Sequence, residues 1–211
     1  MEQWIAMLLL ASAIWLLQIR KISDSVPILA FQSFVLALTA GAMWHQTGLL
    51  HLFVAALLTL IVKSMIIPAI LHYTIRKIDV HRQVERVTSK YASLLIAIIL
   101  AVAGFYVTSR LHLPSTKFGA PYLPASVTLV FLGTFIMIDH KKALMQGVGL
   151  ITIENGLFLA AQSMSYGMPL MVELGIFFDM LVTVVIIGIL SLRIHSAFES
   201  LNIEKMSSLK G

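Results

Sequence analysis

Residues 143–163 read ALMQGVGLITIENGLFLAAQS, a run in which Glu154 is the only charged side chain. A helix needs about 20 mostly apolar residues to cross the hydrocarbon core of a membrane, and this run has that length. At a rise of about 1.5 Å per residue, Glu154 lies about 18 Å from Lys142, the last basic residue before the run. The stretch therefore predicts a membrane-spanning helix with a carboxyl group near the middle of the bilayer.

Most of the remaining chain has the same character. Hydrophobic residues make up 59% of the 211 residues and charged residues only 12%, and the mean hydropathy of +0.93 does not fit a soluble chain. Six further apolar runs lie at residues 3–17, 26–44, 49–73, 91–109, 124–138 and 169–192. We therefore predict an all-α integral membrane protein with seven transmembrane helices and no soluble catalytic module. Because residues 1–4 lack the basic region of a signal peptide, we expect the first run to remain as an anchor.

The basic residues predict the orientation, since cytoplasmic loops carry an excess of Lys and Arg. With the N-terminus outside, the outer side receives only Arg110 and Lys117. The inner side then receives twelve basic residues: Arg20, Lys21, Arg76, Lys77, Arg82, Arg86, Lys90, Lys141, Lys142, Arg193, Lys205 and Lys210. We predict an outer N-terminus and a cytoplasmic C-terminus.

Several kinds of site are excluded or disfavoured by composition. The chain has no cysteine, which excludes disulfides, thiolate metal sites and iron–sulfur ligation by this subunit. The seven histidines lie at or near the ends of the runs without metal-ligand spacing, so we expect interfacial or loop histidines and no metal site. We find no catalytic residue set, no cofactor motif and no sign of a nucleic-acid partner, because the net charge of +5 sits in short loops.

Two loops remain open to interpretation. The mixed charges of residues 76–90 suit either a surface helix that docks a cytoplasmic partner or a retention signal at the membrane face. The outer loop LHLPSTKFGAPYLP carries three prolines and predicts an irregular linker. It divides the chain into residues 1–120, with four helices and the linker, and residues 121–211, with three helices and a cytoplasmic tail.

Four charged side chains fall inside the predicted spans: Lys63, Glu154, Glu173 and Asp179. A charge at the centre of a membrane helix costs about 2.5–3.5 kcal/mol on an insertion scale, and such residues usually mark ion pathways. Asp179 lies about 15 Å from the outer edge and Lys63 slightly to the cytoplasmic side of centre. Glu173 is only about 6 Å inside that edge, where simple hydration and a relay role are both open.

The helical neighbours of these groups predict that the three central ones face the protein. Small residues flank Glu154 on its own helix face, and the polar Thr183 lies one turn from Asp179. Pro68, five residues after Lys63, can open or kink the helix there. We expect Lys63, Glu154 and Asp179 to form a proton path, with Asn155 and Gln162 bonding across helices. The alternative is a static set of charges that fixes helix packing.

Three segments of the chain resemble known families. Residues 147–161 (GVGLITIENGLFLAA), 172–180 (VELGIFFDM) and 201–211 (LNIEKMSSLKG) resemble the three-helix NuoK-type subunit of respiratory complex I. With its four additional N-terminal helices, the whole chain resembles the hydrogenase-4 component E family, membrane subunits of formate hydrogenlyase-type complexes. IVKSMIIP, residues 61–68, is similar to a Lys-to-Pro segment of antiporter-like subunits.

The resemblance implies a proton-translocating subunit of a group 4 nickel–iron hydrogenase complex in the prokaryotic inner membrane. Its partners would be antiporter-like and quinone-module-like membrane subunits and the hydrogenase arm. In the NuoK-type family two glutamates on successive helices serve a lateral proton path, and these roles carry over to Glu154 and Asp179. The pattern departs in two ways, since Glu154 comes one turn later than the family acid and Asp179 replaces a glutamate about one turn deeper. A multi-subunit sodium/proton antiporter and a purely structural scaffold remain alternatives.

Overall fold

The computed structural model describes residues 2–77, 86–110, 122–165 and 170–207, and this part of the chain is helical apart from short connections and one isolated bridge between Arg86 and His140. The helices run as follows: α1 Glu2–Gln18, the short 3-10 helix η1 Ile22–Asp24, α2 Ser25–Thr47, α3 Leu50–Leu58, the π-helix η2 Thr59–Ile66, α4 Ile67–Lys77, α5 Lys90–Arg110, α6 Tyr122–Asp139, α7 Ala143–Ser165 and α8 Leu170–Ser207. Since α3, η2 and α4 follow each other without a break, they form one rod, and the described part contains seven rods in all.

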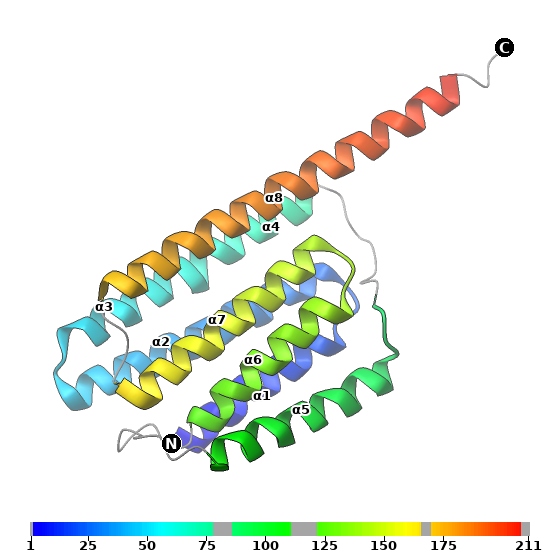
Figure 1. The fold of residues 1–211 in the computed structure, drawn as a ribbon. Helices are drawn as coiled ribbons and strands as arrows, with labels where there is room; N and C mark the ends of the chain where they lie inside the picture. Colours follow the sequence, from blue (N-terminus) through cyan, green and yellow to red (C-terminus); the bar gives the residue numbers. More distant parts are fainter. Residues whose placement is uncertain (1, 78–85, 111–121, 166–169, 208–211) are drawn as a thin grey trace.

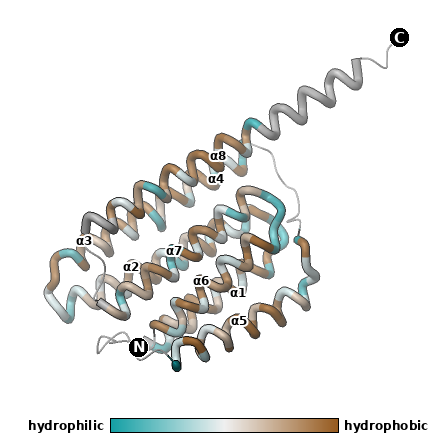
Figure 2. Tube along the Cα trace, viewed as in Figure 1, coloured by the Kyte–Doolittle hydropathy of each residue, from teal (hydrophilic) through white to brown (hydrophobic). Residues whose placement is uncertain are grey.

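The seven predicted apolar runs match these seven rods, which confirms an all-helical, multi-pass membrane protein. Six rods are long and apolar enough to cross a membrane. The first rod, α1, has 17 residues, so its role as a full span stays a prediction, as does the orientation of the chain. Figure 2 shows the hydrophilic segments gathered near the ends of the rods, including the turn between α6 and α7.

The last helix is longer than the predicted run, which ended at residue 192. It continues to Ser207 because residues 193–207 contain neither Gly nor Pro, so nothing in the sequence stops the helix where the apolar residues end. In Figure 1 this C-terminal part of α8 extends beyond the other helices.

An antiparallel pair, α6 and α7, lies inside the bundle (Figure 1). One edge is formed by α5, which packs on α6, and the other by α8, which packs on α4. Both α1 and α2 contact this central pair, α1 through α6 and α2 through α7. The described helices of the two predicted segments, residues 1–120 and 121–211, therefore pack against each other, and the division into two modules stays a prediction.

Glycines allow α6 and α7 to approach closely. A Cβ atom added to Gly149 would lie 2.7 Å from the carbonyl oxygen of Gly133 and 2.6 Å from Cγ of Met137. A Cβ added to Gly156 would lie 2.8 Å from the carbonyl oxygen of Ser126. These contacts place Glu154, between the two glycines of α7, at a fixed depth and rotation in the bundle.

Candidate functional site

An ion pair joins the middle of the bundle. Nζ of Lys63 on η2 lies 3.3 Å from Oε2 of Glu154 on α7, and their side chains are 2% and 14% exposed. The two residues stand on elements separated by about ninety positions in sequence. The helix packing therefore brings together two of the charged residues that the sequence places inside spans.

The backbone around Lys63 is π-helical. The N–H of Ile67 donates to the carbonyl of Val62, five residues earlier, at the end of the π-helix. Pro68 follows directly and has no N–H to donate, so a carbonyl of the preceding turn loses its usual partner. This confirms the prediction that Pro68 opens the helix near Lys63, and π-helical segments occur frequently at functional sites.

Asp179 on α8 shares a cavity with this pair. The cavity has a volume of about 290 Å³. Its walls are formed by Lys63, Glu154, Leu157, Phe158, Ile176, Phe177 and Asp179. The prediction that the three groups face the protein holds for Lys63 and Glu154, whereas Asp179 also lies exposed on the outer surface of the bundle. Its helix α8 is an edge helix, so one side of Asp179 is left uncovered by the residues that the structure describes.

Two aromatic rings complete the surroundings of the ammonium group. Nζ of Lys63 lies 5.7 Å from the ring centroid of Phe158 and 5.6 Å from that of Phe177. A cation within about 6 Å of a ring face is attracted by the ring quadrupole, more strongly where water is excluded. The rings therefore stabilise positive charge on Lys63 while keeping the wall of the cavity apolar.

On the other side of Lys63, a chain of polar side chains crosses the bundle to α1. Nζ of Lys63 donates to Oδ1 of Asn155 at 3.3 Å, and Nδ2 of Asn155 donates to Oε1 of Gln32 at 3.0 Å. Nε2 of Gln32 donates to Oγ of Ser12 at 3.1 Å, and that hydroxyl donates to the carbonyl of Leu9 at 2.7 Å. Every bond runs in the same direction, so each acceptor oxygen faces toward Lys63. This alignment stabilises the ammonium form.

The supporting polar residues are placed as follows. The bonds of Asn155 to α2 confirm that it bonds across helices, and Gln162 does so too, since its Oε1 accepts from Oγ1 of Thr39 at 2.7 Å. Thr183 is half-buried one turn from Asp179. The side chain of Glu173 lies outside the described residues. The role of Gln32 could not be predicted from the sequence, because an amide in an apolar run shows its role only when its partner helix is known.

A second polar cluster, at the turn between α6 and α7, was also missed. Asp139, buried at the end of α6, accepts hydrogen bonds from the backbone N–H of Thr88 at 2.9 Å, from its hydroxyl at 2.6 Å and from Oγ of Ser93 at 3.1 Å. A guanidinium N–H of Arg86 donates to the carbonyl of Ile19. Residues 86–90 are thereby held against the bundle, while residues 78–85 of the same loop lie outside the described part, as does the outer linker at 111–121.

His140 lies in the connection between α6 and α7, at the end of a rod as expected, and only 1% of its surface is accessible. Its Nδ1 donates to the carbonyl of Ile136 at 2.8 Å, and its buried Nε2 has no hydrogen-bond partner among the described residues. Burial lowers the pKa of His140 below its ordinary value near 6.5, against a smaller opposing effect of the bond to Ile136 and of Asp139. Burial likewise lowers the pKa of Arg86, although Asp139 opposes the shift.

The fold and site define a multi-pass, all-helical membrane protein with a charge pair sequestered among its helices. Comparison with known proteins then finds distant relatives along nearly the whole chain. The chain is 22% identical over 207 residues to hydrogenase-4 component E of Escherichia coli, covering 98% of this chain and 96% of that protein. The same values hold for hydrogenase-4 component E of Shigella flexneri.

A relative in Mycobacterium tuberculosis, the uncharacterized protein Rv0085, is 27% identical over 209 residues, with 96% of this chain and 92% of the relative covered. No family model and no solved structure matches the chain. The full-length alignments show distant homology to hydrogenase-4 component E and confirm that resemblance.

Proposed function

We propose that this chain conducts protons laterally within a membrane complex of the group 4 nickel–iron hydrogenase or formate hydrogenlyase type. The observation that carries the proposal is the Lys63–Glu154 ion pair, which lies inside the apolar bundle and shares a cavity with Asp179. Intramembrane ionisable groups are expensive, so a set of three around one cavity favours ion transfer over a static support.

The residues of the cavity suit a relay in which the charge of each depends on the others. Neutralising Glu154 removes the counter-ion of Lys63, so a proton that arrives at the carboxylate favours departure of a proton from the ammonium group. A volume of about 290 Å³ exceeds what one water molecule needs. Water between the three polar groups would connect Asp179, at the surface of α8, with the buried pair.

Homology supports the setting of this relay. The relatives in Escherichia coli and Shigella flexneri are components of hydrogenase-4, so we assign this chain to a hydrogenase complex in a prokaryotic inner membrane. The distribution of basic residues supports an outer N-terminus. Neighbouring antiporter-like and quinone-module-like subunits would exchange protons with it, and the hydrogenase arm would supply the electron transfer. The chain itself needs no cofactor for this role. Retention of hydrogenase subunits after mild detergent extraction would distinguish this complex from a sodium/proton antiporter.

Substitution Glu154→Gln tests the relay. It keeps the size of the side chain and removes its titration, so we expect an assembled complex whose electron transfer drives proton uptake into vesicles at least tenfold more slowly. Gln162→Met serves as the control on the same helix, because it removes a buried polar group bonded to α2 without changing a charge. We expect wild-type proton uptake from the control.

Two results would contradict the proposal. Wild-type proton uptake by the Glu154→Gln complex would show that this carboxyl group is no relay. Loss of assembly with normal uptake by the surviving complex would instead support a scaffold in which the charges only hold helices together.

A further inference from the structure

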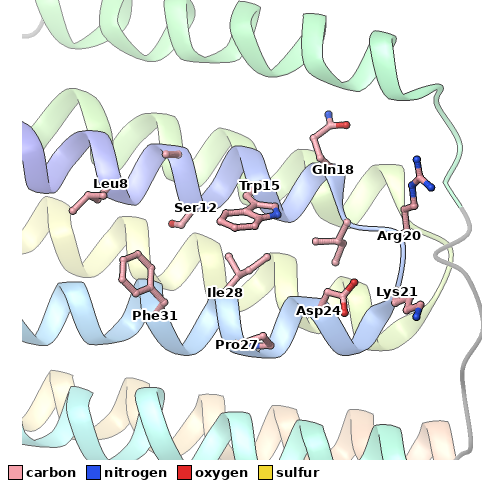
Figure 3. A pocket seen from close by; sticks show the side chains of 12 residues that line it. Leu8, Ser12, Trp15, Gln18, Arg20, Lys21, Asp24, Pro27, Ile28 and Phe31 are labelled. Carbon is pink, nitrogen blue, oxygen red and sulfur yellow. The ribbon is translucent and has the colours of Figure 1, made fainter.

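A groove runs along the outer surface of the bundle between α1 and the segment formed by η1 and α2. Its volume is about 830 Å³, and it lies apart from the cavity that holds Asp179. The residues that line its walls include Ala11, Ser12, Trp15, Ile28 and Phe31. Figure 3 shows Arg20, Lys21 and Asp24 together at one end, with Leu8 and Phe31 at the other.

Most of the groove is apolar and open toward the surroundings of the protein. Trp15 is 66% exposed and Phe31 47% exposed, and Ile28 lies between them in Figure 3. From Gln18, the last residue of α1, to Leu8 the helix rises about 15 Å, half of the roughly 30 Å hydrocarbon core of a bilayer. The groove therefore has the depth of one membrane leaflet and walls that suit an acyl chain.

The polar end carries the charges that a phosphate group requires. Arg20 and Lys21 are consecutive, exposed basic residues at the end of α1. Asp24 faces the same end, so the three side chains sum to a charge of +1. A lipid with one negative charge neutralises this sum, whereas a zwitterionic headgroup leaves the positive charge in place. Asp24 can also accept a hydrogen bond from a headgroup hydroxyl.

We propose that this groove binds an anionic glycerophospholipid of the phosphatidylglycerol type, with its phosphate at Arg20 and Lys21 and one acyl chain along Trp15, Ile28 and Phe31. The acyl chain then covers Ser12, the last side chain of the hydrogen-bonded chain that begins at Lys63. This lipid site is independent of the proton relay, since none of its charged residues lines the cavity around Lys63.

Binding of defined lipids to the purified, full-length protein tests the site. Dioleoylphosphatidylglycerol, dioleoylphosphatidylethanolamine and dioleoylphosphatidylcholine are each titrated against protein in mild detergent, and bound lipid is counted by native mass spectrometry. We expect one phosphatidylglycerol to bind at least tenfold more tightly than either zwitterionic lipid. Equal affinity for the three lipids would overturn the proposal.

Two variants locate the binding. Replacing both basic residues, Arg20→Gln with Lys21→Gln, should weaken the affinity for phosphatidylglycerol about 25-fold, because each basic side chain near a membrane surface contributes about a fivefold factor. The matched control, Arg76→Gln with Lys141→Gln, removes two exposed basic residues outside the groove and should leave the affinity unchanged. If both double variants weaken the affinity for phosphatidylglycerol equally, the effect comes from the overall charge of the protein, and the site is refuted.

The second variant, Ala11→Phe, fills the groove without changing a charge. Ala11 is exposed, so the larger ring does not disturb the core, and we expect the preference for phosphatidylglycerol to disappear. A photoreactive phenylalanine at position 31 then reports the occupant in native membranes. A cross-link to phospholipid supports the proposal, and a cross-link to a neighbouring subunit in its place overturns it.

Discussion

Lys63 is stabilised inside the bundle by three kinds of contact. The carboxylate of Glu154 supplies the opposite charge, Asn155 accepts a hydrogen bond, and the rings of Phe158 and Phe177 lie within 6 Å of the ammonium group. Removing one partner of a buried ion pair leaves the other charge uncompensated, whereas removing both can be nearly neutral. The pair should therefore behave as a unit.

A double-mutant cycle tests this coupling. We expect Lys63→Met alone to destabilise the protein by about 3–5 kcal/mol, because it leaves Glu154 buried without its counter-ion. Adding Glu154→Gln to Lys63→Met should recover most of that loss, a result that thermal unfolding in detergent would measure. Additive destabilisation by the two substitutions would show that they do not stabilise each other.

His140 predicts a dependence of stability on pH. Because burial lowers its pKa in the folded protein, the unfolded chain binds the proton first as the pH falls. The stabilisation is thus fully present above pH 6.5, the ordinary pKa, and is lost as the pH falls through the lower pKa of the folded state. We expect the melting temperature of wild type to fall more steeply below pH 6.5 than that of His140→Gln. Parallel profiles would exclude His140 as the cause.

At the scale of elements, the contact between α6 and α7 depends on glycines. We expect Gly149→Ala to destabilise the protein by about 1–3 kcal/mol, because the new methyl group would meet the backbone of Gly133 and push the helices apart. Gly41→Ala in α2 is the matched control, since a Cβ there meets nothing within 4 Å. The control should be neutral or stabilising by up to about 1 kcal/mol. Equal melting temperatures for the two variants would refute the close approach.

The helices themselves were predictable from sequence, and their partners were not. Length and hydropathy are local properties, so each apolar run could be assigned to a rod, and Pro68 marked the opened helix beside Lys63. The end of α8 was missed because hydropathy marks where lipid contact ends and says little about where helical hydrogen bonding ends. The cluster around Asp139 could not be predicted, because a carboxylate at the end of an apolar run is just as often exposed to water as buried in contacts.

The candidate site, too, could be predicted from the sequence only in part. Sequence placed Lys63, Glu154 and Asp179 at similar depths, since depth follows from helical rise along one element. It did not predict the roles of Gln32 and Ser12, because their bonds depend on how α1, α2 and α7 rotate against one another. Rotation is set by contacts between elements distant in sequence, which a single sequence does not display.

At the scale of the whole molecule, Asp179 is an exposed carboxylate on an edge helix of an apolar bundle. Phe178 beside it is 70% exposed, and charged groups at the depth of the hydrocarbon are expected to face protein or water. A neighbouring subunit that packs on α8 would cover the ring of Phe178, and a cationic or hydrogen-bond-donating group on it would pair with the carboxylate of Asp179. This surface of α8 is therefore our expected contact with the next subunit of the complex.

Asp179→Leu tests this contact at two levels. In the isolated chain we expect an unchanged or slightly higher melting temperature, because the substitution removes an exposed charge from the apolar surface. In the complex we expect reduced co-purification of the adjoining subunit, whose partner charge is lost. Asp179→Glu retains the charge and should retain the subunit. Full co-purification with Asp179→Leu would place the interface elsewhere.

The one-way hydrogen-bond chain from Lys63 to α1 has a consequence for the direction of transfer. Its links beyond Lys63 pass through the carboxamides of Asn155 and Gln32, which neither release nor accept a proton near neutral pH. The hydrogen-bonded side chains thus hold Lys63 in place but do not transfer protons toward α1. Protons in the proposed relay therefore do not leave through this amide branch, and among the described residues the path from Lys63 and Glu154 to the surface of the bundle runs past Asp179.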